Sequence, residues 1–230
     1  MKPILFNTEM VKAILDDRKT TTRRIIKGMA LDWLTKDGFT PKVVADPDNY
    51  LAPYTVGDIL YVRETFYQYG EWYDTMKRVQ IKGEWETVAK HTFVAKQGFP
   101  VYFKNTLPGN IKAKHAYKDG LGYYKRPSIF MPKEAAHIFL CVTSIKAERL
   151  QDITNAGALA EGCDGRGLGP SSGCDGSLSV APYDFSVEKF GTVWDSTVKK
   201  SDVDRYGWGA NPWVWVYEFE RCEKPKEGLI

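Results

Sequence analysis

The sequence of 230 residues has only four cysteines and three histidines, and it has no long apolar run. No stretch approaches the ~20 apolar residues that a membrane-spanning helix needs. The apolar part of the N-terminus is too short for a signal peptide. We therefore expect a cytoplasmic protein without a membrane segment.

The few cysteines and histidines form no familiar ligand pattern. No CxxC pair is present, so neither a zinc ribbon nor a thioredoxin-type motif is predicted. Cys163 and Cys174 share a glycine-rich loop that could hold a disulfide or a metal clip, but free thiols fit a chain without a secretory signature better. His91, His115 and His137 are widely spaced. We expect neither a metal nor a cofactor.

The glycine-rich segment 162–169 lacks the context of a phosphate-binding loop. It does not follow an apolar strand, and it does not open a helix with Lys before Ser or Thr. A P-loop and a dinucleotide-binding fingerprint are therefore excluded. We predict that residues 162–182 form an irregular loop.

Positive charge and aromatic residues are concentrated in one part of the chain. The net charge is only +3, but residues 76–133 carry twelve Lys and Arg against three acids, together with nine aromatics. This combination is typical of a protein that binds RNA or single strands. An inserted hairpin with an aromatic core face and solvated lysines has the same composition, and such a basic insertion could instead contact a protein partner. These interpretations stay open.

The apolar patterns predict strands at residues 59–66, 138–149 and 213–220, with short aromatic strands between residues 67 and 126. Only short helices separate the three main strands, which indicates an α+β fold with a mixed, mostly antiparallel β-barrel rather than a βαβ sheet. Residues 35–55 read as a loop.

Three short helices are predicted from capping residues and apolar spacing. Asn7 can cap a helix from Thr8 to about Arg18, and Thr154 can cap one that ends at Glu161 before Gly162. Ser186 can cap another helix that turns four residues inward, namely Val187, Phe190, Val193 and Trp194.

The first candidate site is the segment 18–24, Arg-Lys-Thr-Thr-Thr-Arg-Arg. A lysine can act as base for a neighbouring hydroxyl when burial or other cations lower its pKa. The same groups could hold a phosphate through guanidinium and hydroxyl donors. A solvated basic turn is the simplest reading, and residue types alone favour it.

Three further charged residues lie at the ends of predicted elements, where a functional and a structural interpretation are both open. Arg63 and Glu64 end an apolar strand, where charges face a cleft or pair with each other. Glu161 closes the helix capped by Thr154, although a carboxylate is mildly unfavourable at the negative end of a helix dipole. Solvent exposure would also account for Glu161.

Taken in order, these segments resemble ASCH domains of the PUA-like β-barrel superfamily. The motifs that carry the resemblance are Arg18-Lys19-Thr20-x-Thr22-x-Arg24, the Gly57-Asp58 turn, the segment Leu150–Thr154 with its helix, and the last strand, Trp213–Phe219. The usual pattern has Gly where this chain has Asp17. The longer form is similar to ASCH-containing bacteriophage and prophage proteins, which carry similar Val-Arg-Glu-Thr, Pro-Ser-Ile-x-Met-Pro and Asn-Pro-Trp-Val-Trp segments. The resemblance implies a single ASCH-like domain over 1–230, with a large β-rich insertion at about 67–125 and another at 163–186.

The resemblance also implies a function directed at RNA or a modified nucleoside. Similar small bacterial amidohydrolases deacetylate N4-acetylcytidine with a Lys, a Thr and a Glu, which correspond to Lys19, Thr22 and Glu161. In that scheme Lys19 takes the proton of Thr22, Thr22 attacks the acetyl carbonyl, and Glu161 orients the group or carries the proton. Arg24, with Arg63 and Glu64, would bind the substrate. Other ASCH proteins are proposed RNA binders, so a non-catalytic RNA-binding module or a phage accessory protein is the alternative.

Overall fold

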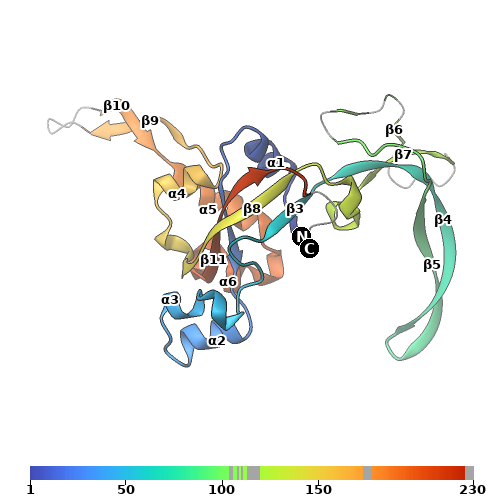
Figure 1. Ribbon diagram of the computed structural model, residues 1–230, viewed down its shortest axis with the longest axis horizontal. Coiled ribbons are helices and arrows are strands. Elements are labelled where there is room, and N and C mark those ends of the chain that lie inside the picture. Colours follow the sequence, from blue (N-terminus) through green and yellow to red (C-terminus); the bar gives the residue numbers. More distant parts are fainter. Residues whose placement is uncertain (104–105, 108, 110, 113–119, 173–177, 226–230) are drawn as a thin grey trace. The chain divides into compact units, whose positions relative to one another are not determined.

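The computed structural model describes the chain except residues 104–105, 108, 110, 113–119, 173–177 and 226–230. The described residues form a mixed α+β fold with eleven strands and six α-helices (Figure 1). Contacts divide the chain into two compact units. The first unit is Met1–Lys2, Glu9–Tyr61 and Ile138–Ile230, and the second unit is Pro3–Thr8 and Val62–His137. The segment 67–125, expected as an insertion, falls within the second unit.

A five-stranded sheet has the order β1-β3-β8-β11-β2. Its strands are β1 (Lys2–Leu5), β3 (Ile59–Arg63), β8 (Phe139–Arg149), β11 (Trp213–Cys222) and β2 (Thr21–Ile25). Strand β11 pairs antiparallel with both β2 and β8, and β3 pairs antiparallel with β8. The three main strands predicted from the apolar patterns are therefore confirmed, although the first ends at Arg63. The larger sheets curl, one of them into half a barrel.

Two helices pack on this sheet through a shared apolar core. Helix α4 (Asn155–Ala160) and helix α5 (Ser186–Thr197) place Ala158, Phe190 and Trp194 against Val214 and Val216 of β11. The predicted inward face of α5 is thus confirmed. The predicted cap is wrong, because Ser186 is the first helical residue and its hydroxyl accepts a hydrogen bond from the Gly165 N–H at 2.9 Å.

The first helix, α1 (Thr8–Leu15), is shorter than predicted. It stops before Arg18 because Asp17 adopts a left-handed conformation, with φ of 56°, which no continuing helix allows. The Arg18 and Lys19 N–H groups both donate to the Ala13 carbonyl, at 2.8 and 3.0 Å. The chain therefore reverses at Lys19 before it enters β2.

Residues 35–55 are not the continuous loop that we expected. Thr40 caps helix α3 (Pro41–Val44), with proline at the first helical position, where its missing N–H costs nothing. Helix α2 (Met29–Thr35) precedes it, and helix α6 (Val203–Tyr206) lies near the end of the chain. None of the helices in the described part of the chain is long and apolar enough to cross a membrane.

The second unit contains a four-stranded sheet with the order β5-β4-β7-β6. Its strands are β4 (Phe66–Ile81), β5 (Glu84–Ala95), β7 (Gly122–Arg126) and β6 (Ile111–Lys112). We expected short strands here, but β4 and β5 form one long hairpin (Figure 1). Lys82 and Gly83 both adopt positive φ at its tip, which is the turn geometry that suits a twisted two-stranded ribbon.

The segment after α4 is also more regular than predicted. Strands β9 (Arg166–Ser172) and β10 (Leu178–Asp184) pair antiparallel where an irregular loop was expected. Cys163 is a free, buried thiol. Cys174 and His115 lie outside the described residues, so the expectations for them are not addressed by the structure.

Candidate functional site

Lys19 and Glu161, which are 142 positions apart, meet in the first unit. Lys19 follows α1, and Glu161 is the last residue of the turn that ends α4. The Thr154 hydroxyl caps α4 by accepting a hydrogen bond from the Gly157 N–H at 3.1 Å, as predicted. The Thr20 N–H donates to the Ala160 carbonyl at 2.8 Å, which ties the end of α4 to the start of β2.

Gly162 allows the two segments to approach this closely. Its φ is +86°, and a Cβ at this position would lie 2.9 Å from the Cβ of Ala13 and 3.4 Å from that of Lys19. Glycine is therefore required here both for backbone conformation and for space. The predicted stop signal of α4 thus also sets the position of Glu161.

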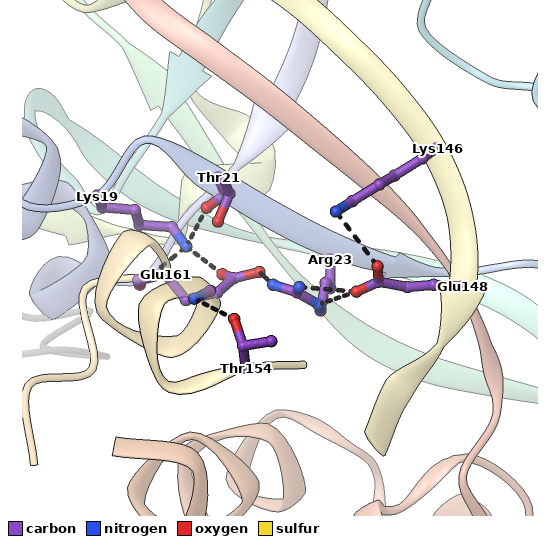
Figure 2. Close-up of polar contacts among 8 residues, drawn as sticks. Lys19, Thr21, Arg23, Lys146, Glu148, Thr154 and Glu161 are labelled. Atoms are coloured by element: carbon purple, nitrogen blue, oxygen red, sulfur yellow. Dashed lines mark hydrogen bonds and ion pairs between the residues drawn. The ribbon is translucent and has the colours of Figure 1, made fainter. Parts of the chain in front are cut away.

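The Lys19 ammonium is completely buried and has three acceptors. Its Nζ donates to Glu161 Oε2 at 2.5 Å, to the Glu161 carbonyl at 3.1 Å and to the Thr21 carbonyl at 2.8 Å (Figure 2). The exposed fraction of the side chain is 0% for Lys19 and 5% for Glu161. An ammonium has three donors, so these bonds satisfy it fully. A solvated basic turn, which residue types alone favoured, is wrong for Lys19.

Arg23 extends this pair into a network of alternating charges. Its Nη1 donates to Glu161 Oε1 at 3.1 Å, and its Nη2 donates to Glu148 Oε1 at 2.7 Å (Figure 2). Lys146 lies 3.4 Å from the other Glu148 oxygen and is half exposed. Lys19 and Arg23 both bind the Glu161 carboxylate, and Arg23 also binds Glu148. These two positive charges offset the unfavourable place of Glu161 at the negative end of a helix dipole.

Gly157 makes room for the Arg23 guanidinium. A Cβ on Gly157 would lie 3.3 Å from Arg23 Nη2 and 3.1 Å from Ile153. The guanidinium also lies over the Phe190 ring, 5.7 Å from its centroid. Arg23 and Glu148 are thus central to the site, although the sequence indicated Arg23 only as a neighbouring cation and gave no signal for Glu148 beyond its place in a strand.

The other predicted residues of β2 belong to the opposite face of the strand. Thr22 lies opposite Tyr217 of β11, and Arg24 lies opposite Trp215. Burial lowers the pKa of Arg24, while the nearby Tyr54, Glu161 and Tyr217 partly restore it. The Tyr54 and Tyr217 rings meet edge to face at 5.1 Å.

Two threonine hydroxyls border the network in different ways. Thr22 is buried, with 3% of its surface exposed. Thr21 Oγ1 is buried and lacks a partner within the described part, since Lys19 binds the Thr21 carbonyl instead. The structure therefore joins Lys19 to Glu161, while Thr22 lies on the face of β2 opposite Arg23.

Cys163 does not supply a reactive thiolate beside this network. Burial raises the pKa of its thiol, the Glu161 carboxylate raises it further, and Lys19 opposes both effects only in part. Thiolate rather than thiol is the nucleophile in cysteine chemistry. Cys163 is therefore held as a neutral thiol beside this network.

A shallow groove of about 480 Å³ lies over β8 in the same unit. Pro41 and Asp46 line one side of it, and Ile145 and Lys146 line the other. Lys146 thus belongs both to the groove and to the charged network through Glu148. A ligand in the groove would contact the exposed end of that network.

Arg63 and Glu64 belong to the second unit and have their own partners there. An Arg63 terminal nitrogen donates to the Ile129 carbonyl. His137 Nε2 lies 3.0 Å from Glu64 Oε1, but that buried oxygen has no well-aligned hydrogen bond. Burial raises the pKa of Glu64 to about 7 and lowers that of His137. The two groups thus both favour their neutral forms.

Comparisons with protein-family models, curated proteins and solved structures found no match to this chain.

Proposed function

We propose that this chain is an ASCH-type protein that acts on or recognises a modified nucleobase, with amide hydrolysis of N4-acetylcytidine-like nucleosides as its reaction. The observation that carries the proposal is the buried pair of Lys19 Nζ and Glu161 Oε2 at 2.5 Å. These are the residues to which the resemblance assigns the base and its partner carboxylate. Their separation of 142 positions makes the pairing a property of the fold.

The chemistry begins with the proton of the Lys19 ammonium. Glu161 accepts this proton across the 2.5 Å hydrogen bond, which leaves a neutral amine on Lys19. The amine then accepts the Thr22 hydroxyl proton as Thr22 Oγ1 bonds to the acetyl carbonyl carbon. The carbonyl oxygen gains negative charge, and the Arg24 guanidinium on the same face of β2 stabilises it.

The second half of the reaction restores the enzyme. When the tetrahedral intermediate collapses, the C–N bond breaks and Lys19 returns a proton to the departing cytosine amino group. Water then gives a proton to the Lys19 amine as its oxygen bonds to the ester carbonyl carbon. The ester C–O bond breaks, Lys19 passes that proton to Thr22 Oγ1, and acetic acid leaves and loses its proton to solvent. Glu161 finally returns its proton to Lys19. The proposed step requires Lys19 Nζ and Thr22 Oγ1 to come within hydrogen-bond distance, although Thr22 lies on the face of β2 opposite Arg23.

Turnover of N4-acetylcytidine to cytidine and acetate, followed by chromatography, tests the proposal. Glu161→Gln, Lys19→Met and Thr22→Val each preserve shape and should each abolish turnover. Thr21→Val is the matched control, because Thr21 Oγ1 is as buried as its neighbour but lies on the other face. Loss of activity in Thr21→Val with retention in Thr22→Val would assign the nucleophile to Thr21 instead.

The absence of turnover on a panel of acylated nucleosides would overturn the hydrolase. The alternative is a non-catalytic module that binds RNA through the same site and the basic residues of 76–133. Such a module would bind single-stranded RNA with an affinity that falls steeply with salt. An affinity insensitive to salt and to neutralisation of those residues would overturn that alternative as well.

A further inference from the structure

A second polar site lies in the second unit, around Arg126, the last residue of β7. Strand β7 alternates, so Arg126 lies on the same face as Tyr124, while Lys125 between them is exposed. Arg126 is only 8% exposed. The charged side chain of Arg126 thus lies on the buried face of the sheet.

Three aromatic rings surround the Arg126 guanidinium. Its central carbon lies 4.2 Å from the centroid of Phe93, 4.9 Å from that of Phe130 and 5.1 Å from that of Trp72. Trp72 and Phe93 lie directly opposite each other on β4 and β5 and pack edge to face. The rings therefore form a walled cage around a cation.

Gly70 makes this cage possible. A Cβ at Gly70 would lie 2.5 Å from the Cζ atom of Phe93 and 2.4 Å from the Val94 carbonyl oxygen. Only glycine lets the Phe93 ring lie across β4 toward Arg126. Glycine at position 70 is therefore required for the Phe93 ring to lie where it does.

The caged guanidinium has no counter-ion among the residues that the structure describes. Among the described residues it forms no ion pair, and its Nε is buried without a hydrogen bond. Arg23, by contrast, is a buried arginine whose charge is balanced, because Glu148 and Glu161 both form ion pairs with it. Burial lowers the pKa of Arg126 with no opposing cause. Aromatic faces offset the burial of a cation only in part, so an anion would stabilise this site.

The cage opens toward a surface turn. Arg126 keeps 8% of its surface exposed, and a ligand would reach its terminal nitrogens through this exposed part. The Phe130 ring, 59% exposed, forms the rim, in the turn Ser128–Phe130. Arg63 holds this turn by donating to the Ile129 carbonyl. The guanidinium thus lies beside an exposed flat ring.

We propose that Arg126 binds the phosphate group of a nucleotide or a nucleic-acid single strand, with a base stacked on Phe130. A guanidinium fork matches two phosphate oxygens, and an aromatic face accepts any base. The excess of twelve basic over three acidic residues in 76–133 favours a phosphate over an uncharged ligand. The site lies outside the Lys19 network and does not depend on the chemistry there.

The experiment measures binding of the full chain to a fluorescein-labelled ten-uridine RNA by fluorescence anisotropy. Arg126→Met keeps the length of the side chain and removes its charge, and we expect affinity to fall about tenfold or more, as for a lost charge-assisted hydrogen bond. Lys36→Met is the control, since it removes one exposed charge outside residues 76–133. It should change affinity by less than about threefold.

Competition identifies the source of the phosphate. Cytidine 5′-monophosphate should displace the RNA from the wild type more effectively than inorganic phosphate, and cytidine without phosphate should not displace it. Phe130→Ala should remove the advantage of the nucleotide over phosphate. Displacement by phosphate alone, with no effect of Phe130→Ala, would overturn the stacking part of the proposal.

Equal RNA affinity in the wild type and Arg126→Met would overturn the proposal, and a thermal unfolding scan shows whether the variant is folded. We expect Arg126→Met to be at least as stable as the wild type, because it removes an unpaired buried charge. If it unfolds, Arg126→Lys replaces it, since that variant keeps the charge but loses the two-pronged contact. Unchanged affinity in a folded Arg126→Lys would equally contradict the proposed phosphate contact.

Discussion

Replacing Glu161 by Gln would remove one charge from the buried network and leave its shape unchanged. Glu161 accepts hydrogen bonds from Lys19 at 2.5 Å and from Arg23 at 3.1 Å. Arg23 would keep Glu148 as a charged partner, but Lys19 would lose the carboxylate that balances its charge. Breaking a fully buried pair costs about 3–5 kcal/mol, so we expect a loss of roughly that size in the free energy of unfolding.

The double variant Lys19→Met/Glu161→Met separates the cost of the unpaired charge from the value of the pair. Replacing both partners of a buried ion pair by apolar side chains is often neutral. We therefore expect the double variant to regain more than half of the stability lost in Glu161→Gln. The assay is urea unfolding followed by tryptophan fluorescence, with linear extrapolation to water.

Glu9→Gln supplies the matched control for a surface pair. Glu9 lies 3.3 Å from Lys12 with 74% of its side chain exposed, and such pairs contribute about 0–1 kcal/mol. The reasoning would be refuted if Glu161→Gln cost as little as Glu9→Gln. It would also be refuted if the double variant were less stable than the single one.

Two further predictions concern Gly162 and Glu64. Gly162→Ala should lower the free energy of unfolding by about 1–3 kcal/mol, because it combines a left-handed φ of +86° with a contact of 2.9 Å to Ala13. Gly38→Ala is the control, since Gly38 has a φ of +71° and open space around it, and it should lower the free energy of unfolding by less in the same urea titration. Equal losses in the two variants would contradict the effect of the Ala13 contact. The pKa of Glu64 rises from 4.5 in the unfolded chain to about 7 in the fold, so the stability from its protonated form is complete below pH 4.5 and is lost as pH rises through 7. The loss amounts to roughly 3 kcal/mol at most. Melting temperatures measured from pH 5 to 8 should fall less steeply in Glu64→Gln than in the wild type. His137→Gln is the control, because burial lowers the pKa of His137 and its effect on stability has the opposite sign. Identical slopes in Glu64→Gln and the wild type would contradict the buried carboxyl.

Local patterns in the sequence were sufficient for much of the first unit. The apolar runs of β8 and β11 identify buried strands whatever surrounds them, since their burial is the reason for their composition. The cap at Thr154 and the stop at Gly162 are local signals with a direct backbone cause, and both are present in the structure. A hairpin was one of the open interpretations of residues 76–133, but the length of β4 and β5 was not predicted because mixed polar and aromatic residues mask their alternation.

The sequence by itself determined where Lys19 and Glu161 lie along the chain and which elements carry them, because capping and apolar spacing are encoded within a few residues. Only the tertiary structure decided that Lys19 is fully buried and that Arg23 and Glu148 complete its network. The same is true of Arg126 and its three rings, which come from four separate segments. Charge compensation depends on distances between residues far apart in the chain, and no local pattern contains those distances.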